Sequence, residues 1–337
     1  MSTITNKTII KNPLETSPKS LLSPNHHACA GCGQIIAARI VADTLGPNTI
    51  IANATGCLEV TTTVYPESSW GMPWIHSLFE NAPAVASGIR AALDYKEKNI
   101  TPLIPSCQCG SSAPLIPQAQ PSSSSRIKVV AQGGDGSTFD IGFGLLSGMW
   151  TRNENIIYIC YDNEGYMNTG AQASAATPWA ANTTTTPASS GHKISAIGSH
   201  LFKKNMIALA LAHGLKYVAQ TTVSYPSDVI AKIKKAQTIN GPSYIQILVP
   251  CVPGWKIKPN QTIELGKLAV QTGLYPIIEY ANGVLTNSLK INSPKTPVEE
   301  YLKQQGRFKH LFKNKTGEKQ LKFIQQIADE NIKKYNL

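Results

Sequence analysis

The 337-residue sequence contains no apolar run that approaches the roughly 18 residues of a membrane-spanning helix. Its first residues also lack the apolar segment and cleavage site of a secretory signal, so we expect neither export nor membrane insertion. No internal repeat is visible. The seven cysteines are an odd number and come without an export signal, which indicates a reducing cytoplasm rather than a disulfide-bonded secreted protein.

Acidic residues are also scarce: 20 Asp and Glu stand against 31 Lys and Arg, for a net charge of +11. A basic protein can attract nucleic acid, but the lysines are scattered, concentrate toward the C-terminus and are not interleaved with aromatic residues. We therefore expect no nucleic-acid partner. The charge fits anionic ligands and acidic protein partners as well as an ordinary lysine-rich surface, and it does not decide between them.

Two glycine-bounded turns each follow a short, apolar, β-branched run that is typical of a buried strand in a parallel sheet. The turn at 133–136 follows residues 127–132, and the turn at 161–170 follows residues 156–160. Residues 139–150 between them have the length of a helix. The pattern predicts a βαβ unit with both turns at the carboxyl ends of its strands, where open α/β sheets bind ligands.

The residue types on these turns suit a diphosphate bound through Mg²⁺. This ion takes about six oxygen ligands, of which only one or two are carboxylates. Asp135 offers a carboxylate, Asn163 an amide oxygen and the turn at Gly165 a backbone carbonyl. Gly134 and Gly136 let the backbone approach a phosphate at the N-terminus of the next helix. Either turn alone is common in proteins, but the pair across one βαβ unit predicts thiamine diphosphate.

Four cysteines form a second candidate site. Cys29 and Cys32 make a CxxC pair before the helix-like segment 34–45, and Cys57 and Cys251 each follow a strand-like run. By the rule for parallel strands, all four belong to the edge of the sheet that carries the diphosphate turns. Four thiolates hold either a [4Fe–4S] cluster or a structural zinc ion. Structural zinc sites commonly use two close pairs, so the isolated Cys57 and Cys251 favour the cluster.

The other three cysteines are not assigned to the site. We expect Cys160 to fill space in a buried strand, and we assign no role to Cys107 and Cys109. These two lie in the proline- and serine-rich stretch 101–126, which we predict to be an exposed loop.

Strands and helices alternate along the rest of the chain, which predicts one large doubly wound α/β core. We interpret residues 1–23 as a mobile arm, 24–260 as the α/β domain and 261–337 as an irregular tail that packs on partner subunits. The further elements that we predict are helices at 82–98, 203–213 and 227–237, and strands near 50, at 215–220 and at 244–249.

Several stretches resemble the β subunits of pyruvate synthases (pyruvate:ferredoxin oxidoreductases), in the 2-oxoacid:ferredoxin oxidoreductase family. The resemblance covers roughly residues 24–312 and implies a doubly wound, mostly parallel sheet of the thiamine diphosphate-binding (PP-type) fold. It rests on residues 27–33, 53–60, 73–76, 79–82, 177–179, 183–187, 250–251, 299–302 and 305–308, together with the two turns.

The resemblance also implies a role for each site residue. Asn168 reaches toward the reacting centre as the catalytic residue, and Gln34 replaces a glutamate that contacts thiamine in some members. The implied ligands are Cys29, Cys32, Cys57 and Cys251 for a [4Fe–4S] cluster, and Asp135, Asn163 and Gly165 for Mg²⁺. The implied thiamine contacts are Thr55, Cys57, Gly134, Asp135, Gly136, Ser137, Asn163, Glu164, Gly165, Tyr166, Met167 and Asn168. We interpret His27, His76, Glu59 and Glu80 as structural.

The implied reaction is the reversible, coenzyme A-dependent oxidative decarboxylation of pyruvate, with electrons passing through the cluster to ferredoxin. In the family, an α subunit supplies the carboxylate that activates thiamine. The sequence also lacks the dense cysteine run of a two-cluster ferredoxin domain. We therefore expect α, γ and ferredoxin-like δ subunits as partners. The alternatives are a 2-oxoisovalerate oxidoreductase, a non-redox thiamine enzyme with a Cys₄ zinc site, and a subunit that only scaffolds a complex.

Overall fold

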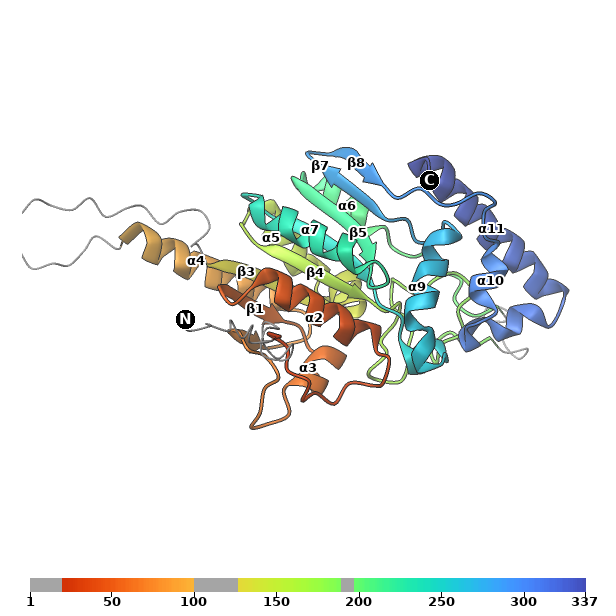
Figure 1. The fold of residues 1–337 in the computed structure, drawn as a ribbon, viewed down its shortest axis with the longest axis horizontal. Helices are drawn as coiled ribbons and strands as arrows, with labels where there is room; N and C mark the ends of the chain where they lie inside the picture. Colours follow the sequence, from red (N-terminus) through yellow and green to blue (C-terminus); the bar gives the residue numbers. More distant parts are fainter. Residues whose placement is uncertain (1–19, 100–126, 189–196) are drawn as a thin grey trace, which may run out of the picture.

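The computed structural model describes residues 20–99, 127–188 and 197–337, and these residues are built around one eight-stranded sheet (Figure 1). The strand order is β2-β1-β3-β4-β6-β5-β7-β8. The first six strands in this order run parallel to one another. Strand β7 pairs antiparallel with β5, and β8 pairs antiparallel with β7. The strands are β1 (Thr49–Asn53), β2 (Trp74–His76), β3 (Lys128–Gly134), β4 (Ile157–Asp162), β5 (Tyr217–Thr222), β6 (Ser243–Leu248), β7 (Ile278–Ala281) and β8 (Val284–Ser288).

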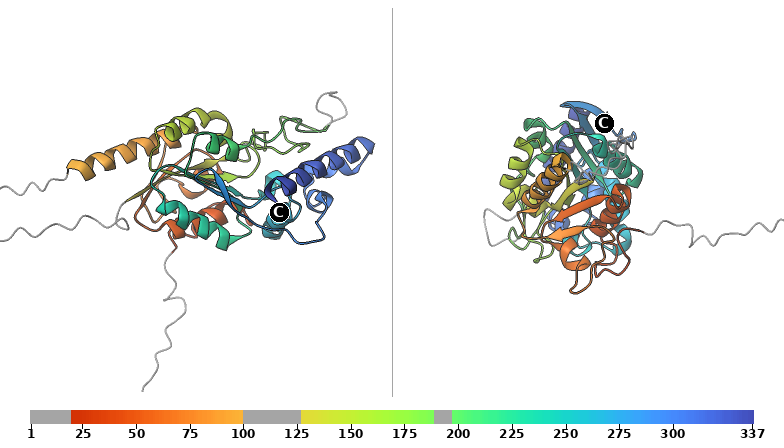
Figure 2. Two further views of the ribbon diagram at one scale, coloured as in Figure 1. Left: turned by 90° about the horizontal axis from the view of Figure 1, so that it is seen from above. Right: turned by 90° about the vertical axis from the view of Figure 1, so that its left-hand side faces the viewer.

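Helices cover both faces of this sheet, as Figure 2 shows edge-on. The side chains of Ile157, Ile159 and Tyr161 on β4 join one apolar cluster, whereas Tyr158 and Cys160 join the cluster on the opposite face. Both faces of a central strand are therefore apolar, which is why these strands read as continuous hydrophobic runs. One face is covered by α2 (Gly33–Leu45) and α7 (Pro226–Thr238), the other by α4 (Ala82–Asn99), α5 (Phe143–Thr151) and α6 (Met206–Ala212). The predicted doubly wound, mostly parallel α/β fold is confirmed.

The C-terminal residues form helices and the hairpin of β7 and β8, not the irregular tail expected from the sequence. A third apolar cluster joins Leu321 and Ile324 to Trp255 and to Leu248 on the central strand β6, so this region packs on its own chain. Figure 1 shows α9, α10 and α11 gathered at one end of the sheet. The elements are α8 (Val252–Trp255), η3 (Pro259–Gln261), α9 (Thr262–Gln271), α10 (Val298–Leu302), η4 (Gly306–Phe312) and α11 (Lys315–Tyr335).

The packed part of the chain begins before residue 24. Leu22 is fully buried and forms an isolated antiparallel bridge with Trp70. Residues 1–19 of the predicted arm, and the predicted loop 101–126 with Cys107 and Cys109, lie outside the described residues. Among the residues that are described, no helix is both long and apolar enough to cross a membrane.

The helix expected at 139–150 has an unusual start. A π-helical turn, η2 (Gly136–Ile141), follows β3 directly, and the amide of Gly142 donates to the carbonyl oxygen of Ser137. The regular helix α5 begins only at Phe143. π-Helical turns are rare and frequent at functional sites, and this one follows Asp135.

Candidate active site

The two predicted turns lie beside one another at the carboxyl ends of β3 and β4, where they wall a cavity of about 360 Å³. Thr55, which follows β1, and Cys57, the first residue of α3 (Cys57–Thr62), line the cavity from a third segment. Every thiamine contact implied by the resemblance lies on this wall except Glu164, which lines a separate cavity of about 240 Å³ together with Lys203.

The side-chain amide of Asn163 lies between two acceptor oxygens of the larger cavity. With its nitrogen turned toward them, the amide donates to Oδ1 of Asp135 at 2.9 Å and to the carbonyl oxygen of Gly165 at 2.7 Å. A cation bound by the same three groups would require the opposite orientation, with the amide oxygen directed at the ion. Two further groups donate hydrogen bonds to Asp135. The hydroxyl of Ser174 donates to Oδ2 at 2.6 Å, and the backbone amide of Asn163 donates to Oδ1 at 3.1 Å.

The electrostatics of Asp135 favour a cation at this point. Complete burial, followed by the negative charge of Asp162, raises the pKa of Asp135 to about 8, although Ser174 and Lys203 counteract the shift. Without a counter-charge the buried carboxylate therefore prefers to hold a proton. A divalent cation bound to the same oxygens would reverse that preference because it stabilises the carboxylate form.

Gly136 has a steric reason to be glycine. A Cβ atom built on it would lie 2.3 Å from the ring of Tyr166, which crosses the cavity wall at this point. The hydroxyl of Tyr166 donates to Asp140 at 2.7 Å, and its ring lies against Phe79, with 6.0 Å between the ring centroids. The first turn can therefore approach the second only with a glycine at this position.

The side chain of Glu164 anchors the second turn from behind. Its carboxylate accepts from Arg307 at 2.6 Å and from Lys203 at 3.0 Å. Burial raises its pKa, but the two cations outweigh burial and leave the pKa below its ordinary value. The indole nitrogen of Trp255 also donates to the carbonyl oxygen of Asn163 at 2.8 Å. The sequence assigned no role to Arg307, Lys203 or Trp255, although Arg307 falls within the matching stretch 305–308.

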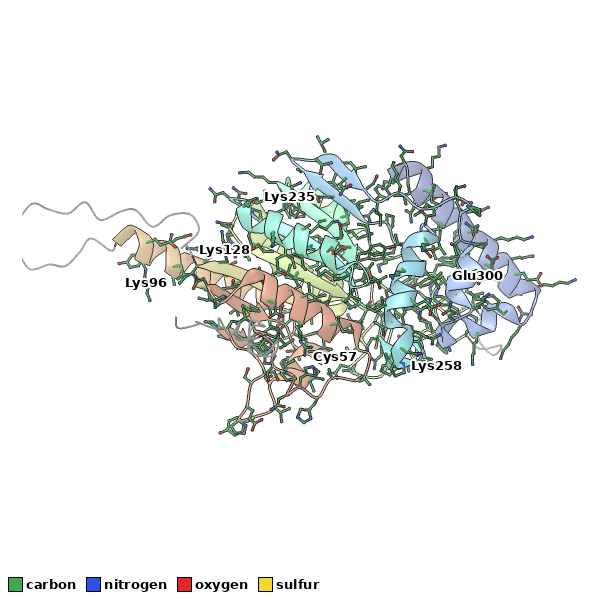
Figure 3. The ribbon with its side chains drawn as sticks, in the orientation of Figure 1. Cys57, Lys96, Lys128, Lys235, Lys258 and Glu300 are labelled. Atoms are coloured by element: carbon green, nitrogen blue, oxygen red, sulfur yellow. The ribbon has the colours of Figure 1, made fainter. Side chains whose placement is uncertain are left out.

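A neighbouring cavity of about 250 Å³ is lined by all four predicted cysteine ligands. Cys32 lies at the N-terminus of α2 and Cys251 at the N-terminus of α8. Figure 3 shows Cys57 below α2. Burial, and then the charges of the other cysteines, raise the pKa of Cys57 to about 12 and that of Cys251 to about 12. These thiols therefore keep their protons at neutral pH unless a metal displaces them.

All four cysteines contribute to the lining of this cavity. In the part of the chain that the structure describes, no group of three or more His, Cys, Asp and Glu side chains is close enough to hold one metal ion. Cys160 stands apart, fully buried within β4 as the sequence predicted.

The two cavities adjoin each other. Gln34, at the start of α2, lines both of them and is buried, so an amide stands where some family members carry a glutamate. The shared wall is formed by Gln34, Cys57, Leu58, Asn163, Met167 and Asn168. The larger cavity therefore adjoins the cysteines along this wall, whereas Asp135 and Gly165 line only the larger cavity.

Comparisons with known proteins show which family this chain resembles. The family described as thiamine pyrophosphate enzyme, C-terminal TPP binding domain, matches residues 54–247. The pyruvate synthase subunit PorB of Methanosarcina barkeri is 48% identical over 323 residues, which cover 96% of this chain and 99% of that protein. PorB of Methanocaldococcus jannaschii is 47% identical over 311 residues, covering 92% and 95%.

Two further relatives are more distant. The ketoisovalerate oxidoreductase subunit VorB of Pyrococcus abyssi is 40% identical over 296 residues, covering 86% of this chain and 85% of that protein. Among solved structures, 2-oxoglutarate:ferredoxin oxidoreductase from Magnetococcus marinus, with 2-oxoglutarate, coenzyme A and succinyl-CoA bound, matches with a TM-score of 0.50 and 21% identity. That match covers 78% of this chain and 82% of the other, and it supports the fold.

Proposed function

The chain belongs to the pyruvate synthase PorB family, and we propose that it is the subunit that binds thiamine diphosphate beside an iron–sulfur cluster. It is an oxidoreductase subunit of the 2-oxoacid type, and its reaction is the reversible, coenzyme A-dependent oxidative decarboxylation of pyruvate to acetyl-CoA and CO₂. One observation carries the proposal: the cofactor cavity and the four-cysteine cavity share a wall of six residues that includes Cys57 and Asn168.

The donor set at the floor of the cavity fits Mg²⁺ with a diphosphate. The carboxylate of Asp135, the side-chain amide of Asn163 and the carbonyl of Gly165 meet there. With the amide oxygen turned toward the ion, these groups would supply three ligands, and phosphate oxygens and water would complete the shell. Bound thiamine diphosphate supplies the electron sink that decarboxylation of a 2-oxoacid requires. Asp135, Asn163 and Gly165 would hold the diphosphate through Mg²⁺, and Asn168, on the wall shared with the cysteine cavity, would orient the substrate.

The cysteine cavity fits a [4Fe–4S] cluster better than zinc. Zinc in a Cys₄ site gathers its four sulfur atoms at about 2.3 Å from one centre. Four thiols around a cavity of about 250 Å³ suit a larger group. A bound cluster accepts electrons one at a time. Cys29, Cys32, Cys57 and Cys251 would hold it against the reactive end of the thiamine cavity.

The pyruvate type is favoured over the branched-chain type by sequence similarity. The PorB relatives are 48% and 47% identical over more than nine-tenths of the chain, whereas VorB is 40% identical over 86% of it. We propose pyruvate as the main substrate, with 2-oxoisovalerate as the alternative to test. A scaffold without catalytic function is disfavoured because eleven of the twelve implied thiamine contacts line one cavity.

The cavity needs a partner subunit. Within the described residues, Asp135 is the one carboxylate on its wall, and it lies at the diphosphate end. Thiamine also requires a carboxylate against its aminopyrimidine ring. We propose that an α subunit provides it and that γ and ferredoxin-like δ subunits complete a cytoplasmic complex that reduces ferredoxin.

The test is to purify the complex without oxygen and to assay viologen reduction with pyruvate and coenzyme A. We expect bound thiamine diphosphate, about four irons and four sulfides at this chain's site, and a higher kcat/KM for pyruvate than for 2-oxoisovalerate. Zinc in place of iron, or a preference for the branched-chain acid, would establish one of the alternatives.

A further inference from the structure

One histidine outside the described cofactor wall is connected to it. The hydroxyl of Thr55, which lines the cofactor cavity, lies 2.7 Å from Nε2 of His76. The other ring nitrogen, Nδ1, lies 3.9 Å from Oε1 of Glu59. Glu59 occupies the first turn of α3, two residues after the cluster-side residue Cys57. A threonine, a histidine and a glutamate thus form a line that starts at the cavity wall.

The fold holds His76 firmly in this place. It ends strand β2, whose parallel register pairs it with Asn53 at the end of β1. Its ring stacks on Trp74 with centroids 6.2 Å apart, and Trp74 stacks on Trp70 at 5.9 Å. The imidazole is half-buried, with 28% of its side chain exposed. Such a ring cannot turn away from Thr55 without breaking the stack, so its orientation is fixed.

We propose that His76 is a positioning residue of the reaction, which fixes the Thr55 side chain at the reactive end of the cofactor cavity while Glu59 steadies the imidazole from behind. The proposal rests on the function proposed above. It differs from a purely structural role for His76, because it requires that loss of the histidine act through Thr55.

Threonine needs such a partner because it carries both a hydroxyl and a methyl group on Cβ. Its χ1 angle has more than one favourable staggered position, and each presents a different group to the cavity. The hydrogen bond to His76 selects one of them. Thr55 lines the cofactor cavity and stands two residues before Cys57, which belongs to the wall shared with the cysteine cavity. If a bound cluster takes up the electrons, a 2-oxoacid held beside Cys57 would bring its oxygens within reach of the side chain that His76 orients.

The experiment uses the assembled complex loaded with thiamine diphosphate and Mg²⁺, in four forms: wild type, His76→Ala, Thr55→Val and the double variant. Two properties are measured: kcat and KM for pyruvate, and calorimetric binding of acetylphosphonate, an analogue of pyruvate that cannot be decarboxylated. We expect each single variant to lower kcat/KM about tenfold, mostly through kcat, as the loss of one hydrogen bond implies. The affinity for acetylphosphonate should fall together with kcat/KM. The double variant should lose no more kcat/KM than either single variant.

Controls separate this outcome from general damage. All variants are assayed at concentrations of thiamine diphosphate and Mg²⁺ that saturate each of them, so that a weakened cofactor contact of Thr55 does not lower the measured rate. His76→Gln, which can still reach the hydroxyl, should recover part of the activity. His213 forms a 2.7 Å contact of the same kind with the hydroxyl of Ser147, away from the cavity, so His213→Gln should leave kcat/KM unchanged.

The proposal would be overturned if the fold-loss of kcat/KM in the double variant equalled the product of the two single losses. It would also be overturned if His76→Ala left kcat/KM unchanged. A wild-type complex that neither turns over pyruvate nor binds the analogue would instead contradict the proposed function. The variants therefore test the role of His76, and the wild-type complex separately tests the proposed function.

Discussion

The Nη2 atom of Arg307 donates a 2.6 Å hydrogen bond to Oε2 of Glu164, although 143 residues separate the two in sequence. Both side chains are buried, with 2% and 7% exposed. Arg307 also stacks on the ring of Trp255, which holds the carbonyl of Asn163. Glu164 itself adopts a left-handed backbone conformation, with φ +68°. The C-terminal region thereby fixes a strained turn that carries two of the proposed Mg²⁺ ligands.

Replacing Arg307 should therefore weaken cofactor binding at a distance. In Arg307→Ala, the buried Glu164 keeps only Lys203 as a charged partner, and breaking a buried pair costs about 3–5 kcal/mol. We expect a lower Tm and at least about tenfold weaker binding of thiamine diphosphate at saturating Mg²⁺, measured by calorimetric titration of the assembled complex. Lys303→Ala, which removes an exposed ion pair with Glu300, is the control and should change neither property.

Glu164 also predicts a dependence of stability on pH. The positive charges of Lys203 and Arg307 overcome the effect of burial and leave its folded pKa below the ordinary value of 4.5. An acid with a depressed pKa contributes stability that is present above the unfolded pKa and is lost as pH falls through the folded pKa. The difference in Tm between wild type and Glu164→Gln should therefore be full near neutral pH and shrink below 4.5. A difference that grows with acid would contradict this assignment, and the exposed Glu300→Gln should show no such trend.

The Mg²⁺ assignment predicts a selective loss of cofactor binding in Asp135→Asn. The substitution keeps the shape of the side chain and removes the one carboxylate at the site, so the diphosphate charge is poorly neutralised. We expect Mg²⁺-dependent affinity for thiamine diphosphate to fall about a hundredfold or more, while the fold persists. Calorimetric titration with and without Mg²⁺ measures both. Asp43→Asn, an exposed carboxylate remote from the cavity, is the control, and an unchanged affinity in Asp135→Asn would rule out the assignment.

The cysteine assignment predicts that Cys251→Ala loses iron and electron transfer. A four-iron cluster held by three thiolates has an exposed iron and degrades in air. Iron and sulfide analysis, with the visible spectrum, should show the loss. Cys160→Ala is the matched control, because Cys160 is buried in β4 away from the cavity and should leave the iron content unchanged. Equal iron loss in both variants would mean that the fourth ligand is wrong.

The chain alone should not turn over any 2-oxoacid. Its cavity wall carries no second carboxylate for the thiamine ring within the described residues, and its sequence has no two-cluster relay. The test reconstitutes the isolated chain with thiamine diphosphate, Mg²⁺, iron and sulfide, and assays viologen reduction with pyruvate and coenzyme A. Adding the partner subunits should restore activity, and turnover without them comparable to that of the complete complex would refute the split site.

Much of the site was visible in the sequence because its residues follow buried strands. The runs before 133–136 and 161–170 are apolar on both faces, and parallel strands bring their carboxyl ends to one edge. Asp135 and Asn163 could therefore be paired without coordinates. The same rule placed Cys57 and Cys251 at that edge. Local pattern and sheet geometry were sufficient for these residues.

Other features depended on tertiary structure. The hairpin of β7 and β8 and the C-terminal helices carry short or weak periodic patterns, and their stability comes from packing against β5, Trp255 and Leu248. The position of Glu164 outside the cavity followed from its pairing with Arg307, a contact between distant segments that no local pattern encodes. The link from Thr55 to His76 depended likewise on the register of β1 and β2. The sequence by itself determined which residues reach the edge of the sheet, since that follows from strand periodicity. Only the folded chain decided which side chains hold them there, because those contacts join segments that are remote in sequence.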